Sequence, residues 1–178
     1  MVETLEQKQQ TQVQEKNIQP VAGQQSKEKK QIIVIIAFEK KYLHLIHHVH
    51  GEEKTKELTF ISQSTNTNIS SVAEAKQVLL AKTGVTIMHL PNVESLGNFS
   101  HEDDRSEVEA HVYICTQWFK ADVLDGIAAP YKTVMNCIKN NEDFLSVDKE
   151  TLTPLTKAIL KNYAPAIQMA YLKASSKQ

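Results

Sequence analysis

Apolar and polar positions change their spacing along the chain in a way that predicts both strands and helices. Residues 31–38 form a continuous, largely β-branched apolar run, which is typical of a strand covered on both faces. After a turn at 39–41, residues 42–49 are predicted to form its partner strand. Residues 107–118 alternate between apolar and polar, which predicts a half-buried strand. Together these patterns indicate a largely antiparallel or mixed sheet.

Weaker patterns predict the remaining elements. We expect charged, polar and acidic loops at 51–56, 62–70 and 100–106, respectively. Strands are predicted at 58–61, 85–88 and 93–99, and a short strand or extended link at 144–147. Pro130 precedes apolar residues at helical spacing, and Thr153 followed by Pro154 is typical of a capped helix start. Pro165 should interrupt that last helix. This order of elements predicts an α+β fold, an α/β/α sandwich.

The best-marked helix lies in the middle of the chain, at residues 71–84. Ser71 and Glu74 have the spacing of a capping box, and Gly84 can adopt the left-handed conformation that ends a helix. Leu79 lies within a stripe of apolar residues at helical spacing. One face of this helix is therefore predicted to pack on the core.

Residues 1–30 differ from the rest of the chain because they are rich in Gln, Lys and Glu. They carry too few large apolar residues to offset their ordering entropy, which predicts a disordered tail. A coiled-coil arm is the alternative, but these apolar residues do not form a heptad seam. We therefore predict one domain over 31–173 and a short tail at 174–178.

Composition narrows the classes of function. The 178 residues carry a formal net charge of −1, so no global field draws the protein to nucleic acid or to an anionic membrane. No apolar run reaches the roughly 20 residues needed to span a bilayer. The N-terminus lacks the features of a signal or transit peptide, which predicts an intracellular protein of the cytoplasm or nucleus and leaves mitochondrial import open. Cys115 and Cys137 lie in apolar stretches without paired spacing and are expected to be buried free thiols.

The mid-chain helix resembles the signature helix of the Nudix hydrolases. That signature is Gly-x5-Glu-x7-Arg-Glu-U-x-Glu-Glu-x-Gly-U, where U is a bulky aliphatic residue. Leu79, Gly84 and Val85 match its aliphatic and glycine positions. The resemblance covers about residues 31–163, and "FLSVDKETLTPL" at 144–155 resembles the late strand and last-helix start of the family. It implies a mixed sheet with helices packed on both sides.

The signature's remaining positions, including all its charged ones, differ in this chain. The leading Gly, the first Glu and the Arg are replaced by Gln63, Ile69 and Gln77, and the later Glu positions by Val78, Ala81 and Lys82. The family uses Mg²⁺ to neutralise a pyrophosphate and to activate water, and Mg²⁺ takes oxygen ligands. Val78 and Ala81 offer none, and Lys82 would place a cation near the metal. The resemblance therefore implies a domain without ordinary Nudix catalysis.

An acidic stretch offers an alternative site. Asp103, Asp104 and Glu107 could form a relocated cation site, which would bind Mg²⁺. The other interpretation is a solvated loop followed by the polar face of a strand. If the cleft of the family persists, the resemblance places residues 62–70, Lys82 and the Glu107–Glu109 face in its walls.

Four histidines form a second cluster at the predicted second strand. Strand alternation places His44, His48 and His50 on one face and His47 on the other. Zinc binding is one interpretation, although no Cys, Asp or Glu stands at ligand spacing to complete a tetrahedral site. Partly exposed strand histidines that respond to mild acid are the other.

These observations predict a catalytically inactive Nudix-like domain that acts as an interaction or scaffold subunit for other proteins. Similar silent domains serve in RNA-processing complexes and mitochondrial ribosomes, so the resemblance also implies an RNA-associated complex. The sequence itself shows no basic and aromatic footprint for RNA. Two alternatives stay open: a divergent hydrolase of nucleoside diphosphate derivatives with a relocated metal site, and a nucleotide sensor that does not hydrolyse its ligand.

Overall fold

The computed structural model describes residues 29–66, 71–83, 92–104, 107–116, 126–143, 145 and 149–176. The predicted tail up to residue 28, Gly84 and the strand at 85–88 lie outside these ranges, as does most of the link at 144–147.

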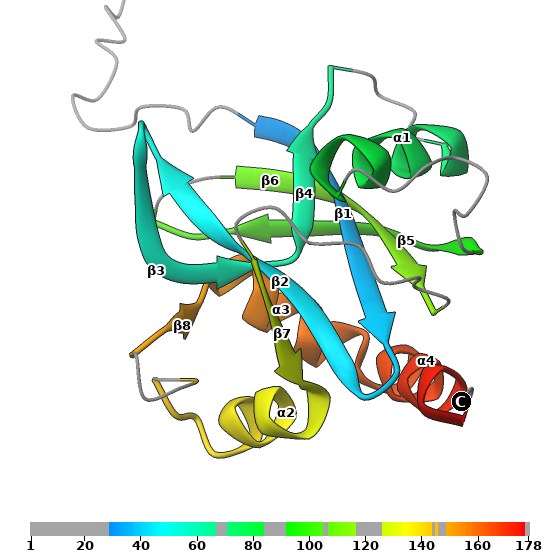
Figure 1. The fold of residues 1–178 in the computed structure, drawn as a ribbon. Helices are drawn as coiled ribbons and strands as arrows, with labels where there is room; N and C mark the ends of the chain where they lie inside the picture. The colour runs from blue at the N-terminus through cyan, green and yellow to red at the C-terminus, as the bar shows by residue number, and fades with distance from the viewer. Residues whose placement is uncertain are drawn as a thin grey trace, which may run out of the picture.

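A mixed, curled sheet forms the centre of the molecule (Figure 1). Its strands are β1 (Lys29–Glu39), β2 (Tyr42–His50), β3 (Glu53–Thr59), β4 (Ile61–Ser64), β5 (Val93–Glu102), β6 (Glu107–Cys115), β7 (Gly126–Pro130) and β8 (Thr151–Leu152). The strand order is β5-β6-β1-β2-β3-β8, while β4 pairs with β1 and β7 pairs with β2. The β1–β6 and β3–β8 pairs are parallel and the others are antiparallel.

Helices cover both sides of this sheet, as Figure 1 shows. The helix α1 (Val72–Thr83) lies on one side, and α2 (Tyr131–Lys139), α3 (Pro154–Asn162) and α4 (Ala164–Ser176) lie on the other. Because successive residues of β1 face opposite sides, Ile33 and Ile35 pack with Leu79 of α1, whereas Val34 and Ile36 pack with the C-terminal helices. The predicted α+β, α/β/α architecture is confirmed, as is a first strand covered on both faces.

Local signals predicted two helix starts and one helix break correctly. The Oγ of Ser71 accepts a hydrogen bond from the Glu74 N–H at 3.2 Å, which is the serine half of the predicted capping box. Helix α3 begins at Pro154, and α3 and α4 are separate helices that meet just before Pro165. The missing N–H and the ring of proline explain both positions.

Replacing Ser71 tests this cap. Ser71→Ala should lower the free energy of unfolding by about 1 kcal/mol, because the Glu74 N–H loses its acceptor. Ser71→Asn keeps an acceptor and should stay within a few tenths of a kcal/mol of the wild type. Urea denaturation measures both variants, and wild-type stability of Ser71→Ala would show that the cap contributes nothing.

The expected charged loop at 51–56 is wrong, because most of it belongs to a β-hairpin. His50 pairs with Glu53, so Gly51 and Glu52 alone form the turn. Gly51 has φ +66°, which suits glycine at the first position of a tight two-residue hairpin turn. The glycine before Glu52 was a usable sequence signal for this hairpin.

The single strand expected at 58–61 is divided between two strands. β3 ends at Thr59 and pairs with β2, whereas β4 begins at Ile61 and pairs with β1. Phe60 lies between them and is fully buried. The apolar run is continuous in sequence because the chain passes through the core as it changes partner strands.

The half-buried strand expected at 107–118 is instead buried on both faces over most of β6. It lies between β5 and β1 in the sheet, and His111 and Tyr113 are buried, as is Val112 between them. Strand β5 also continues to Glu102, into the expected acidic loop. A strand inside a sheet with helices on both sides loses the solvent-facing side that alternation implies.

The ends of the domain differ slightly from the predicted bounds of 31 and 173. The first strand begins at Lys29, and α4 continues to Ser176 with Ala174 buried. Cys115 and Cys137 are buried free thiols, as predicted, and burial raises the pKa of Cys137. None of the helices in the described ranges is long and apolar enough to cross a membrane.

Candidate binding cleft

A cleft of about 1230 Å³ lies where the β2–β3 hairpin, β4 and the start of α3 meet the ends of other elements. Its lining comes from β1 (Lys30, Ile32), β2 (His48, His50), β3 (Glu53, Thr55, Glu57, Thr59), β4 (Ser62, Gln63, Ser64), α1 (Lys82), the end of β5 (Asp103), β6 (Val108) and the start of α3 (Thr153, Pro154, Leu155). This lining combines hydroxyl and amide groups with charged groups of both signs. The cleft can therefore form many hydrogen bonds without strongly favouring either sign of charge.

The wall at the start of α3 is held in place by hydrogen bonds. The N–H of Thr153 donates to the carbonyl oxygen of Leu58 at 3.0 Å, which ties the helix start to β3. The Thr153 hydroxyl donates to Thr156 Oγ1 at 2.8 Å, and Thr59 Oγ1 lies 3.1 Å from the same Thr156 oxygen. Thr153 and Thr156 are buried, and their hydroxyl groups are hydrogen-bonded, as buried polar groups in proteins usually are.

The structure separates the four histidines that the sequence groups together. His44 is buried and its Nε2 lies 3.2 Å from Glu39 Oε2. His47 Nε2 lies 3.0 Å from Glu150 Oε1, which links β2 to the segment before β8. His48 and His50 are exposed and line the cleft. In the ranges that the structure describes, no three His, Cys, Asp or Glu side chains are placed to hold a metal ion.

Burial lowers the pKa of His44 below its ordinary value of 6.5, and the Glu39 carboxylate only partly opposes this. As the pH falls below 6.5, the unfolded chain takes up a proton that the folded chain does not, so the free energy of unfolding should decrease. We expect His44→Gln to make this decrease shallower between pH 7.5 and 5.5. Urea unfolding at several pH values measures both slopes, and equal slopes would exclude His44 as the cause.

Among the described residues, Asp103, Asp104 and Glu107 are not found as a group of three that could hold a metal ion. Asp103 lines the cleft, with its Oδ2 3.5 Å from His101 Nε2. Asp104 is exposed, and Glu107 pairs with Glu102 across the β5–β6 ladder. Glu109 instead forms an ion pair with Lys29 at 3.3 Å.

The structure places some of the expected cleft residues in the cleft and not others. Lys82 and residues 62–64 line it, whereas Glu107 and Glu109 are not among its lining residues in the described chain. Residues 67–70 of the expected wall lie outside the described ranges. Sequence reasoning missed the β2–β3 hairpin and the start of α3 as walls. The glycine turn and the Thr153–Pro154 cap were the signals for these two elements.

Comparison with known proteins gives a consistent result at the level of the fold. No family model and no curated protein sequence matches the chain. Solved structures do match it. The MutT protein from Methanosarcina mazei Go1 aligns at a TM-score of 0.56 and 12% identity, over 80% of this chain and 98% of that one. The chain has a Nudix-like fold.

Other Nudix structures agree. The Nudix domain of Shewanella oneidensis NrtR, solved as a complex with ADP ribose, aligns at a TM-score of 0.55 and 13% identity, over 79% of this chain and 90% of that one. A Nudix hydrolase from Nitrosomonas europaea aligns at 0.52 and 11% identity, over 78% and 90%. At these identities the likeness concerns the fold, and the chemistry follows from the side chains present.

Within this Nudix-like fold, α1 is the helix that resembles the family's signature helix. Val78 is buried against the core, Ala81 is exposed, and Lys82 lines the cleft. Mg²⁺ needs oxygen ligands, and these three side chains supply a methyl surface and an ammonium. Val78, Ala81 and Lys82 therefore do not fit the magnesium ion that the family uses.

Proposed function

We propose that this chain is a Nudix-like domain that binds without hydrolysing and acts as an interaction subunit for another protein. The observation that carries the proposal is Lys82, because α1 brings its ammonium to the cleft where the signature helix of the family has carboxylates. A cation at that position repels Mg²⁺ by several kcal/mol at an effective dielectric constant of about 20. The chain has a Nudix-like fold and a cleft that Lys82 lines, and both features support a binding role.

The cleft is the proposed contact surface. Its hydroxyl and amide groups and its charges of both signs match a polar segment of a partner protein, which presents the same groups. A near-neutral chain has no electrostatic footprint for nucleic acid, so an RNA-associated complex would hold this domain through protein contacts.

Site-specific cross-linking tests the interaction. A photo-reactive amino acid replaces Gln63 in the cleft or, as the matched control, the exposed Lys161 on α3. Gln63 should give a discrete protein cross-link in native extract that survives ribonuclease, and Lys82→Glu should reduce it at least tenfold. Equal cross-linking from both positions, or an unchanged yield with Lys82→Glu, would contradict the proposal.

A turnover assay tests the absence of hydrolysis. The purified protein should leave a panel of nucleoside diphosphate derivatives intact with Mg²⁺ or Mn²⁺. Turnover that disappears with Asp103→Asn would instead show a relocated metal site and would overturn the proposal.

Binding of a nucleotide without hydrolysis is the second candidate, and the cleft volume favours it. About 1230 Å³ leaves enough room for a nucleotide, because small-molecule sites typically measure roughly 300–1,000 Å³. Lys82 lies in the same cleft as the Ser62 and Ser64 hydroxyls, and these groups can bind phosphate oxygens. The Shewanella NrtR domain, which shares the fold, was solved with ADP ribose.

A thermal shift assay tests this second candidate. ADP-ribose at about 100 times its Kd should add about 2.7 kcal/mol of stability, which raises the Tm by several degrees. Lys82→Ala should weaken binding at least tenfold, while Lys161→Ala outside the cleft should leave it unchanged. No shift at millimolar ADP-ribose would exclude this ligand.

A further inference from the structure

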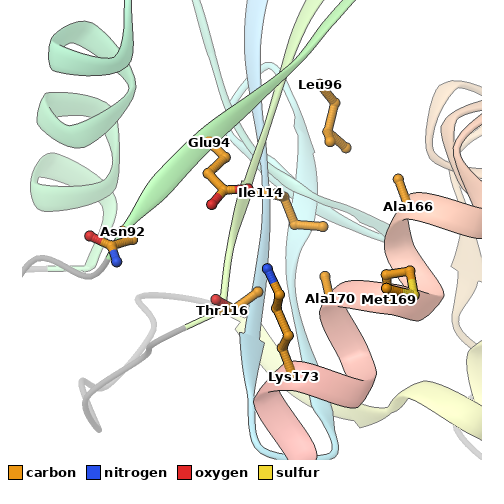
Figure 2. A pocket seen from close by; sticks show the side chains of 9 residues that line it. All are labelled: Asn92, Glu94, Leu96, Ile114, Thr116, Ala166, Met169, Ala170 and Lys173. Carbon is orange, nitrogen blue, oxygen red and sulfur yellow. The ribbon is translucent and has the colours of Figure 1, made fainter.

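A second cavity of about 210 Å³ lies between α4 and the β5–β6 end of the sheet (Figure 2). Ile114 of β6 and Ala170 of α4 belong to the core on the side of the C-terminal helices, opposite to α1. The cavity shares no lining residue with the cleft. An inference about it is therefore independent of the proposed function.

One end of this cavity is polar and carries two opposite charges. Glu94 comes from β5 and Lys173 from α4, and Figure 2 shows the carboxylate and the ammonium directed into the same space. No ion pair joins them to each other or to another residue of the described chain. Asn92 and Thr116 line the same end and add an amide and a hydroxyl group. This end can hold one cationic and one anionic group at the same time.

The other end of the cavity is apolar. Leu96 of β5 and Ile114 of β6 face Ala166 and Ala170, which are one turn apart on α4. The small alanine side chains leave the space open, because a larger side chain at either position would project toward the sheet. Met169 lines the rim and is 62% exposed, and its flexible thioether can adapt to an apolar group.

We propose that this cavity binds a free α-amino acid with an apolar side chain. The amino acid's carboxylate would pair with Lys173 and its ammonium with Glu94, while the side chain would cover Ile114 and Ala170. Paired charges of this kind form the stronger class of hydrogen bonds. A ligand that carries both charges can pair with Glu94 and Lys173 at once, whereas a ligand with a single charge can pair with only one of them.

The size of the cavity agrees with this ligand class. The volume of the cavity is about 210 Å³. It lies below the roughly 300–1,000 Å³ of sites for drug-sized molecules. Leucine or methionine matches it, whereas a nucleotide is too large.

Titration with leucine and its derivatives, followed by NMR or calorimetry on the full chain, tests the proposal. We expect L-leucine to bind at least tenfold more tightly than glycine, leucinamide or N-acetyl-leucine, because each of these lacks the side chain or one charge. Leucinamide and N-acetyl-leucine represent the N- and C-terminal residues of a peptide, so equal binding of either would overturn the proposal of a free amino acid. No leucine binding at 10 mM would also overturn it.

Variants then locate the site. Glu94→Gln and Lys173→Met should each weaken leucine binding at least tenfold, and Ala166→Leu should abolish it by filling the apolar end. Lys161→Met on α3 removes an exposed charge outside the cavity and should leave binding unchanged. The urea midpoint of each variant confirms its folding. Wild-type affinity in the folded Glu94 and Lys173 variants would overturn the proposal.

Discussion

Val78→Glu should destabilise the folded domain by about 4–5 kcal/mol at pH 8, which is about 3.7 pH units above the unfolded pKa of a glutamate. Val78 is only 6% exposed and packs among residues such as Ile33 and Leu79 under α1. A carboxyl group buried there should have its pKa raised by about 3–5 units, and each unit corresponds to about 1.4 kcal/mol. Typical domains have about 5–15 kcal/mol of stability in total, so much of this variant should be unfolded. Urea denaturation followed by circular dichroism measures the loss.

Two control variants isolate the effect of the charge. Val78→Ala removes only apolar volume and should lower stability by about 1.6 kcal/mol, at about 0.8 kcal/mol for each carbon removed. Ala81→Glu introduces the same carboxylate at an exposed position one turn along α1 and should stay within about 0.5 kcal/mol of the wild type.

The dependence on pH gives a further check on Val78→Glu. The introduced carboxyl has a raised pKa in the folded state, so its penalty grows as the pH rises above the unfolded value of about 4.3. The variant should therefore be closer to the wild type at pH 5 than at pH 8. Wild-type stability at pH 8 would show that this face of α1 meets solvent. It would therefore contradict the orientation of α1 that places Lys82 in the cleft.

Phe38→Ala should lower the free energy of unfolding by about 3–5 kcal/mol. Phe38 is fully buried at the end of β1, where its ring meets Tyr131 of α2 edge-on at 5.6 Å between centroids. It also lies 6.2 Å from the ring of Tyr171 on α4, and the two tyrosines stack at 4.3 Å. One ring therefore joins the sheet to two helices, and its loss leaves a cavity that all three elements share.

The exposed Tyr42 provides the matched control for Phe38. Tyr42 is the first residue of β2, just after the turn that follows β1, and it is 46% exposed. Tyr42→Ala should therefore change the free energy of unfolding by no more than about 0.5 kcal/mol. A double-mutant cycle of Phe38→Ala with Tyr171→Ala should give a coupling of about 0.5–1.5 kcal/mol. Additive losses would show that the sheet and α4 are stabilised independently of this aromatic cluster.

Much of the fold followed from local sequence, because the signals act over a few residues. The apolar run at 31–38, the Ser71 cap and Pro165 each restrict the backbone or one face of an element directly. The same short-range patterns gave wrong predictions at Phe60, where one strand was expected, and at His111, where a solvent-facing side was expected. Phe60 lies between two strands that pair with different partners, and His111 lies in a strand whose second face is covered by distant residues.

The candidate site depended on contacts that the sequence does not display. His47 meets Glu150, which is 103 positions away, and His111 bonds to Asn98 and Gln31 from neighbouring strands. Of the four histidines at β2, His44 and His47 therefore bond to separate carboxylates, while His48 and His50 line the cleft. Lys82 and residues 62–64 line the cleft, and the curl of the sheet brings the β2–β3 hairpin and the start of α3 to the same place.

The sequence by itself determined the order of most elements, their caps and breaks, and the absence of carboxylates at Val78, Ala81 and Lys82. Those features depend on residue type and short-range spacing. Only the tertiary structure decided that Val78 faces the core, that Lys82 faces the cleft, and that Glu94 and Lys173 face one cavity from opposite elements. The direction of a side chain depends on what packs around its helix or strand, and those neighbours come from distant parts of the chain.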